Sequence, residues 1–224
     1  MPVSLAVLDL AGTTVSDAGL VEDAFTHALA RGGVPPEDAR HGPMMEHVRA
    51  TMGESKISVF RHLFGDEEAA QHANTAFEEG YAQLVAAGRC APVPGAREAI
   101  DALRAAGCAV VLNTGFSPRT RDELLASLGW SGLADAVLSP ADAGGRGRPH
   151  PDMVLTAMLR VGAPSVHAVA VVGDTPHDVR AGLNAGAGLV AGVLTGGRPA
   201  SELREAGAHH VLDSVADLPR LIAS

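Results

Sequence analysis

The fold of this chain is decided by the stretch Val3-Ser4-Leu5-Ala6-Val7-Leu8-Asp9-Leu10-Ala11-Gly12-Thr13-Thr14. An apolar run of strand length ends in the carboxylate of Asp9, and a glycine and two hydroxyl residues follow almost at once. Buried parallel strands have such continuous apolar sequences, and the ligands of open α/β sheets gather at the carboxyl ends of the strands. The stretch therefore predicts a buried strand that presents Asp9 to a ligand. A turn-forming aspartate at a strand end is the simpler alternative.

A second apolar run, at residues 168–173, ends in Asp174, and Asp178 follows four residues later. Two strand ends of a parallel sheet can place their acids side by side, and Mg²⁺ prefers oxygen ligands of this kind. We expect Mg²⁺ to be bound by Asp9, Asp174 and the main-chain carbonyl of Ala11, with Asp178 in support. Asp178 also suits the first turn of a helix, where the helix dipole stabilises an acid, and the two roles are compatible.

A third strand end and a fixed cation lie between these two runs. Residues 110–113 form an apolar run that leads into Thr114 and Gly115, and Arg148 precedes a Pro-His-Pro segment. A nucleophilic carboxylate, a metal, a pocket of hydroxyl and amide donors and a positive charge are the parts that phosphoryl transfer requires. We expect Thr114 and the Gly115 amide to hold phosphoryl oxygens. Arg148 is favoured over Arg146 as the cation because the two prolines that follow fix its backbone.

In their order along the chain, the motifs Asp-x-Ala-Gly-Thr, Thr-Gly, Arg-Pro-x-Pro and Gly-Asp-Thr-x-x-x-Asp resemble the haloacid dehalogenase superfamily. More narrowly, the chain looks like the phosphonatase (phosphonoacetaldehyde hydrolase) branch. The resemblance implies a doubly wound, Rossmann-like α/β core with an inserted α-helical cap, and a Mg²⁺-dependent hydrolase that forms an aspartyl-phosphate on Asp9. We expect the substrate to be contacted by Gly12, Thr13, Gly115 and Met52.

Strand character disappears after the first motif. Amphipathic spacing indicates helices at 20–30, 45–52, 56–63 and 66–87. Two prolines indicate the start of a further helix at 35–39. We therefore predict a helical cap domain at 17–87, inserted into a core domain that comprises 1–16 and 88–224. Such a cap can close over a site and exclude water from the reaction.

Helices and strands alternate in the remainder of the chain. Strands are predicted at 109–113, 135–138, 166–173, 189–194 and 209–211, and helices at 96–106, 118–128, 151–161, 177–185, 200–206 and 214–222. This alternation is typical of a doubly wound parallel sheet.

The composition excludes several classes of protein. A net charge of −9 over 224 residues argues against a nucleic-acid-binding surface or a surface for anionic membranes, but not against a small anionic substrate. The 46% hydrophobic and 3% aromatic content is typical of a globular core packed from Ala, Val and Leu. Two cysteines are too few for a disulfide framework. Without a leader or an apolar run of membrane-spanning length, the protein is expected to be cytoplasmic.

Ala11 distinguishes the chain from most phosphatases of the superfamily. Those enzymes carry Asp two positions after the nucleophile, where it protonates the departing alkoxide. Ala11 has no proton to give. Either hydrolysis of phosphate monoesters is impaired, or the leaving group is stabilised in another way.

The cap offers such a way at Lys56. The segment Met52-Gly53-Glu54-Ser55-Lys56 is similar to the phosphonatase motif Met-Gly-x-x-Lys, whose lysine forms an imine with the substrate aldehyde. A protonated imine accepts the electron pair of the breaking carbon–phosphorus bond, so no acid is needed. Lys56 is the only lysine beside sixteen arginines, and arginine does not form imines with ease. A lysine on a solvated helix face is the plainer alternative.

The resemblance to phosphonatase is incomplete at two positions. Val59 stands where phosphonatase has a histidine thought to assist proton transfer, and Phe116 stands where it has a tyrosine. His47 and His62 of the cap are candidates to replace the histidine, and a structural role is the alternative for each.

Three functions stay open from the sequence. The first is cleavage of the carbon–phosphorus bond of phosphonoacetaldehyde or another β-carbonyl phosphonate through Lys56. The second is hydrolysis of a small phosphate monoester, with Lys56 only binding the substrate. The third is a weakly catalytic binding or regulatory protein, which the complete set of acids disfavours. The resemblance also implies a homodimer formed through the cap.

Overall fold

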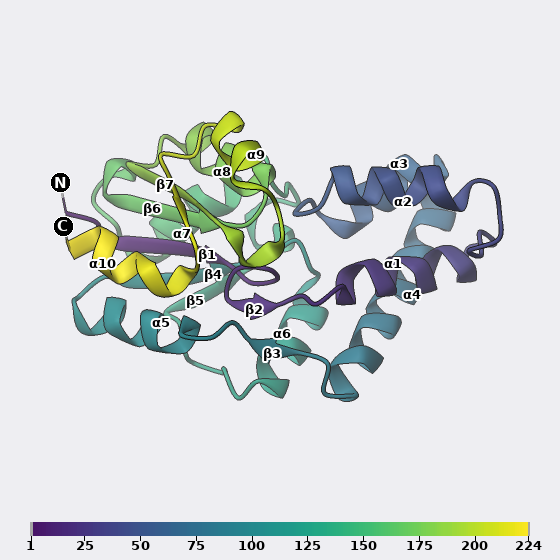
Figure 1. Cartoon of the computed structure of the whole chain (residues 1–224), viewed down its shortest axis with the longest axis horizontal. Helices are drawn as coiled ribbons and strands as arrows, with labels where there is room; N and C mark the ends of the chain where they lie inside the picture. Colours follow the sequence, from purple (N-terminus) through teal and green to yellow (C-terminus); the bar gives the residue numbers. More distant parts are fainter. Residues whose placement is uncertain (1, 224) are drawn as a thin grey trace.

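We describe residues 2–223 from a computed structural model. The core is a six-stranded sheet in which every neighbouring pair is parallel, in the order β5-β4-β1-β6-β7-β8 (Figure 1). Its strands are β1 (Leu5–Asp9), β4 (Ala109–Asn113), β5 (Ala136–Leu138), β6 (Val169–Gly173), β7 (Leu189–Val193) and β8 (His210–Leu212). The chain starts in the middle of the sheet with β1, adds β4 and β5 on one side, and then adds β6, β7 and β8 on the other. This strand order confirms the doubly wound α/β fold.

Both faces of the sheet are buried. The helices that follow the strands are α5 (Ala96–Ala105), α6 (Pro118–Ser127), α7 (Asp152–Val161), α8 (Pro176–Ala185), α9 (Ala200–Glu205) and α10 (Leu218–Ala223). Within β1, Ala6 and Leu8 pack into one apolar cluster, whereas Leu5 and Val7 pack into a second cluster. Because alternate side chains of a strand point to opposite faces, a strand that is covered on both sides has a continuous apolar sequence.

The segment at 20–86, between β1 and α5, is helical. It comprises α1 (Leu20–Arg31), α2 (His41–Ala50), α3 (Lys56–Phe64) and α4 (Glu67–Ala86). These four helices stand beside the sheet rather than over one of its faces (Figure 1). Phe25, Phe60 and Phe77 meet at their centre, with ring centroids 4.8–6.1 Å apart. Apolar spacing in the sequence therefore predicted this helical insert correctly.

Three local predictions were wrong. The chain turns at 35–39 instead of starting a helix there, because the Asp38 carboxylate accepts a hydrogen bond from the backbone N–H of Arg40 and pairs with its guanidinium. The strand predicted at 166–173 begins only at Val169, after a 3-10 turn (Val166–Ala168) in which the Ser165 hydroxyl accepts from a backbone N–H. A further 3-10 turn (Val215–Asp217) precedes α10 where one helix had been expected.

A small antiparallel ribbon joins the two ends of the helical insert. It pairs β2 (Val15–Ser16) with β3 (Ala91–Pro92). Strands of two residues have no periodicity that a sequence pattern could reveal, so this element was missed. Its strands lie just outside the predicted cap limits of 17 and 87, and the exact division into two domains stays a prediction.

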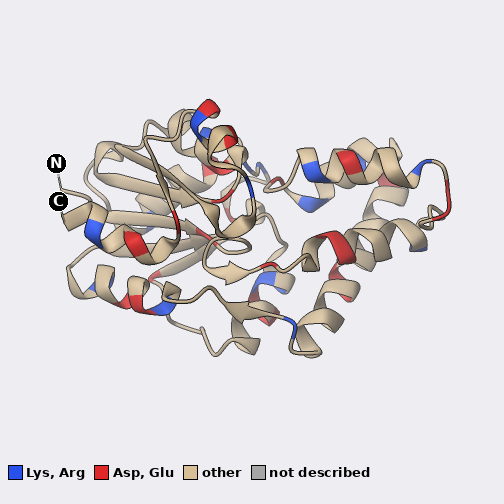
Figure 2. Cartoon of the chain, in the orientation of Figure 1, with Lys and Arg blue, Asp and Glu red and all other residues tan. Residues whose placement is uncertain are grey.

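Charged residues are distributed over the helices and loops (Figure 2). The six strands of the sheet contain no Lys, Arg or Glu, and Asp9 is their only acid. Within residues 2–223, none of the helices combines the length and the apolar character that crossing a bilayer requires.

Candidate active site

The carboxyl ends of β1, β4 and β6 open into a cavity of about 360 Å³. Most of the predicted site residues line it, namely Asp9, Ala11, Met52, Lys56, Thr114, Gly115, Arg148 and Asp174. Gly12, Thr13 and Asp178 are buried and do not line the cavity. The fold thus brings side chains from the sheet edge and from the helical insert to one place.

Arg148 joins two of the acids. Its Nη1 atom donates to Oδ1 of Asp9 and to Oδ1 of Asp178, and all three side chains are buried. Burial raises the pKa of Asp9, Arg148 opposes this effect, and the negative charge of Asp178 adds to it, so that the pKa of Asp9 lies at about 7. Arg146, the other candidate cation, pairs instead with Asp152 at the surface.

The backbone at Gly12 and Gly196 lies so close to the Asp174 side chain that no other residue type would fit at either position. A Cβ atom on Gly12 would lie 2.5 Å from Oδ2 of Asp174, and one on Gly196 would lie 1.8 Å from the same atom. The hydroxyl of Thr13 donates to Oδ1 of Asp174 at 3.2 Å. Gly12 and Thr13 therefore contact the carboxylate of Asp174, although neither residue lines the cavity itself.

Asp178 forms a capping box at the start of α8. The Thr175 hydroxyl and backbone N–H donate to Oδ2 of Asp178 at 2.5 and 3.1 Å, and Asp178 N–H donates back to the Thr175 hydroxyl at 3.3 Å. This arrangement satisfies backbone groups at the helix start. Asp178 is therefore a helix-start acid, and its other oxygen is the one that contacts Arg148.

The three aspartates fit a divalent cation. One oxygen from each of Asp9, Asp174 and Asp178 lies within 4.8 Å of the others. Three buried acids gather here around one guanidinium. The pKa of Asp174 is well above its ordinary value, first because of burial and then because of the charge of Asp9. Buried charge of one sign needs compensation, and a hard cation with oxygen ligands would supply it.

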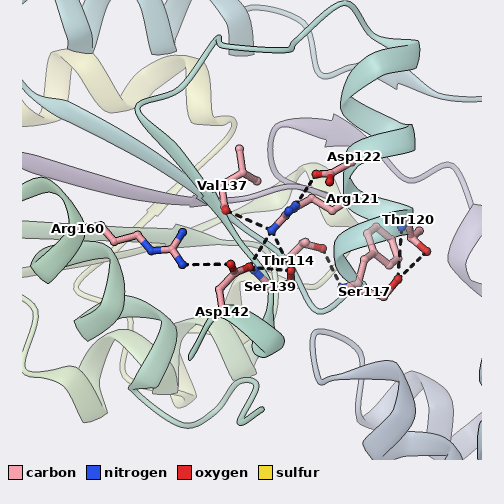
Figure 3. Close-up of polar contacts among 10 residues, drawn as sticks. Thr114, Ser117, Thr120, Arg121, Asp122, Val137, Ser139, Asp142 and Arg160 are labelled. Carbon is pink, nitrogen blue, oxygen red and sulfur yellow. Dashed lines mark hydrogen bonds and ion pairs between the residues drawn. The ribbon is translucent and has the colours of Figure 1, made fainter. Parts of the chain in front are cut away.

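Figure 3 shows the polar contacts that Arg121 and Asp142 make after β5, and Thr114 in the loop after β4. Arg121 of α6 donates from Nη1 to the Ser139 hydroxyl at 3.0 Å and to Oδ2 of Asp142 at 2.8 Å, which fixes the chain after β5. The oxygen of Thr114 accepts a hydrogen bond from the backbone N–H two residues later at 3.2 Å. No described residue accepts the proton of this hydroxyl, so Thr114 can donate toward a ligand.

Lys56 is the first residue of α3, and the residue is only 8% exposed. Its backbone N–H donates to the Gly115 carbonyl at 3.4 Å, which links the helical insert to the loop after β4. Nζ lies 5.7 Å from the ring centroid of Phe25 and 5.4 Å from that of Phe116. Burial, followed by the positive charge of Arg148, lowers the pKa of Lys56 to about 8. Lys56 is thus not on a solvated helix face.

The cavity also contains charged residues that no sequence pattern indicated. Asp17 lies between β2 and α1. Arg49 pairs with Glu22 at 2.9 Å, and Arg198 pairs with Glu202 at 3.2 Å. These residues come from separate segments and match no short motif, so only the folded chain reveals them as neighbours.

The two histidines that were candidate proton carriers lie outside the cavity. The rings of His47 and His62 stack on each other, with centroids 4.0 Å apart and an interplanar angle of 14°. Burial and the neighbouring His62 lower the pKa of His47. Neither residue lines the cavity that contains Lys56.

Comparison with known proteins identifies the family. Residues 3–186 match the family described as haloacid dehalogenase-like hydrolase. The chain belongs to this family. This haloacid dehalogenase-like hydrolase is 32% identical to the phosphonoacetaldehyde hydrolase of Syntrophobacter fumaroxidans, over 99% of the chain and 91% of the relative. It is 29% identical to the probable phosphatase IndB of Dickeya dadantii, over 96% of the chain and 91% of that protein.

Solved structures agree with this assignment. A phosphonoacetaldehyde hydrolase-like protein from Oleispira antarctica superposes with a TM-score of 0.84 at 26% identity, over 100% of the haloacid dehalogenase-like hydrolase and 92% of that protein. A hydrolase from Pseudomonas syringae, at 23% identity, shares the fold with a TM-score of 0.85 over 98% of each chain. The resemblance to the phosphonatase-like branch is therefore confirmed.

Proposed function

We propose that this hydrolase cleaves the carbon–phosphorus bond of phosphonoacetaldehyde or a related carbonyl phosphonate. The observation that carries the proposal is the buried Lys56 in the same cavity as Asp9. A lysine amine is a nucleophile only when it is neutral, and a pKa of about 8 gives a substantial neutral fraction near physiological pH. Relatives named phosphonoacetaldehyde hydrolase support the same chemistry.

Lys56 would provide the electron sink. Its nitrogen attacks the substrate carbonyl, water leaves, and a protonated imine forms. Asp9 then attacks phosphorus, and the electron pair of the carbon–phosphorus bond moves into the imine to give a neutral enamine. The leaving group needs no acid at the moment of cleavage, which is consistent with Ala11 at the position where a general acid would stand. Protonation of the enamine carbon and two hydrolyses release the carbonyl product from Lys56 and phosphate from Asp9.

The phosphoryl group would be held at the sheet edge. We assign Arg148, the Thr114 hydroxyl and the Gly115 amide to its oxygens, since these donors border the cavity beside Asp9. We assign the metal as Mg²⁺, held by Asp9, Asp174 and the Ala11 carbonyl with Asp178 in support. A bound Mg²⁺ neutralises charge on the transferred group.

The remaining predicted site residues are assigned according to whether they line the cavity. Met52 lines the cavity and is a candidate to contact the organic part of the substrate. Gly12 and Thr13 were expected to bind substrate, and we now assign them to positioning Asp174 because that is the carboxylate they contact. A closing movement of the helical insert and a homodimer through it remain part of the proposal.

Hydrolysis of a small phosphate monoester is the second candidate function. The similarity to a probable phosphatase favours it. The cavity of about 360 Å³ also has room for a substrate larger than a two-carbon phosphonate. In that case Lys56 would contribute only its charge.

Turnover of phosphonoacetaldehyde and of a panel of phosphate monoesters, each with Mg²⁺ and with EDTA, separates the two candidates. We expect Mg²⁺-dependent release of phosphate and acetaldehyde from the phosphonate and weak activity on the esters. Ester turnover as fast as phosphonate turnover would favour the second candidate. Full activity in EDTA would remove the metal from the proposal.

A further inference from the structure

Imine formation at Lys56 requires a group that moves protons. An ammonium group must lose a proton before its nitrogen can attack the carbonyl. The hydroxyl of the resulting carbinolamine must then gain a proton before it leaves as water. A single carboxylate that first accepts and then returns a proton can serve both steps.

Five acids line the cavity, of which three pair with an arginine and a fourth, Asp174, is assigned to the metal. Asp9 contacts Arg148, and Asp174 accepts from Thr13. The two glutamates each pair with an arginine that also lines the cavity, Glu22 with Arg49 and Glu202 with Arg198. The fifth acid is Asp17. Within residues 2–223 it has no ion-pair partner within 4.0 Å.

Asp17 lines the same cavity as Lys56, from the connection that precedes α1. Its Oδ1 atom accepts a hydrogen bond from the backbone N–H of Val21 at 3.1 Å, which satisfies one donor in the first turn of α1. Asp17 is half-buried, and burial raises its pKa above the ordinary value of an aspartate. The charges of Asp17 and Lys56 also act on each other: Asp17 raises the pKa of Lys56, and Lys56 lowers that of Asp17.

We propose that Asp17 is the proton carrier for imine formation at Lys56. The inference rests on the proposed function. Asp17 accepts a proton from the Lys56 ammonium through one intervening water, because the two groups lie more than 4.0 Å apart. The freed lone pair then attacks the carbonyl carbon while the carbonyl π electrons move to oxygen. A proton moves from nitrogen to this oxygen to give the carbinolamine. Asp17 then donates its proton to the hydroxyl, water departs with the carbon–oxygen electron pair, and the nitrogen lone pair forms the iminium. Asp17 ends as a carboxylate, and the net products are the iminium and one water.

The variant Asp17→Asn distinguishes a proton carrier from a residue with only a structural role, because the two roles lead to opposite changes in the rate of imine formation. The Asn side-chain oxygen can still accept from the Val21 N–H, so the cap of α1 is kept. Loss of the negative charge lowers the pKa of Lys56 further, because Asp17 is one of the charges that raise it. More of the amine would then be neutral at pH 7. If Asp17 only capped the helix, imine formation would therefore be as fast as in the wild type or faster.

The test is the rate at which borohydride traps an adduct on Lys56 during turnover of phosphonoacetaldehyde at pH 7, followed by mass spectrometry. We expect Asp17→Asn to slow trapping about 10²-fold or more, and Asp17→Glu to restore part of the rate. Asp23→Asn is the matched control, because Asp23 lies in the first turn of α1, close to Asp17 in sequence, but pairs with Arg89 at the surface. Circular dichroism and thermal unfolding verify that each variant is folded.

The outcomes are distinct. Trapping in Asp17→Asn at or above the wild-type rate overturns the role of Asp17 and leaves the proposed function intact. An adduct that fails to form even in the wild type overturns the imine mechanism itself, and the role of Asp17 with it. Should Asp17→Asn fail to fold, Asp17→Ser, whose hydroxyl can also cap a helix, is measured in the same assay and judged by the same criterion.

Discussion

The guanidinium of Arg148 donates to the carboxylate of Asp9 across 139 residues of sequence. The two side chains are only 3% and 5% exposed, so Arg148 is a fixed counter-charge at the end of β1. It offsets part of the effect of burial, which by itself would raise the pKa of Asp9 further. Asp9 therefore remains ionisable near neutral pH although it is almost completely buried, and an ionised carboxylate is what nucleophilic attack requires.

Asp9→Asn should abolish turnover and leave the fold intact. The amide keeps the shape of the side chain but is not a competent nucleophile, and Arg148 retains Asp178 as a partner. Steady-state kinetics on phosphonoacetaldehyde and near-native circular dichroism are the two measurements. A folded Asp9→Asn variant with more than a trace of activity would show that the nucleophile lies elsewhere.

Gly196→Ala should weaken Mg²⁺ binding about 10–100-fold, the size of effect typical of residues that orient metal ligands. The new Cβ would lie 1.8 Å from Oδ2 of Asp174, so the carboxylate must move. Calorimetric titration with Mg²⁺ measures the loss. Gly42→Ala is the control, since nothing lies within 4 Å of a Cβ at that position. Equal Mg²⁺ affinity in Gly196→Ala and the wild type would mean that Asp174 is not a ligand.

Ala11→Asp should raise the hydrolysis of phosphate monoesters. Ala11 lines the cavity two residues after Asp9, and an acid there could protonate a departing alkoxide. General acids typically contribute about 10²–10⁴-fold, which sets the upper limit of the gain. The ratio of ester to phosphonate turnover is the measurement. If wild-type enzyme already hydrolyses sugar phosphates as fast as any phosphonate, the carbon–phosphorus proposal should be abandoned.

Formation of the Lys56 adduct should rise with pH and level off above about pH 8. Burial and Arg148 lower the pKa of this amine from 10.5 to about 8, and only the neutral form attacks a carbonyl. Trapping with borohydride over pH 6–10 measures this ionisation separately from that of Asp9. Lys56→Arg keeps the charge but cannot form the imine, so its turnover should be nearly as low as that of Lys56→Ala. Robust activity of Lys56→Arg would restrict this residue to electrostatic binding of the substrate.

Local sequence patterns were sufficient to predict the fold class and the main acids of the site. Apolar runs that end in Asp9 and Asp174 mark two adjacent parallel strands, and helical spacing marks the insert between β1 and β4. These features are local, because a buried strand or helix needs apolar residues at fixed intervals along the chain. Where the local signal was only a pair of prolines, as at 35–39, the helix prediction failed.

Which charged residues lie close together depends on how the chain folds in three dimensions. No rule of sequence spacing connects Asp17 with Lys56 or Gly196 with Asp174. Nor does any such rule predict that His47 and His62 stack on each other outside the cavity. Burial and electrostatic interaction depend on the distance between atoms in space, and the fold sets that distance irrespective of separation along the chain. The sequence therefore indicated that Lys56 is suited to imine chemistry. The lowered pKa of Lys56 and its proximity to Asp17 arise only from the packing of the helical insert against the sheet edge.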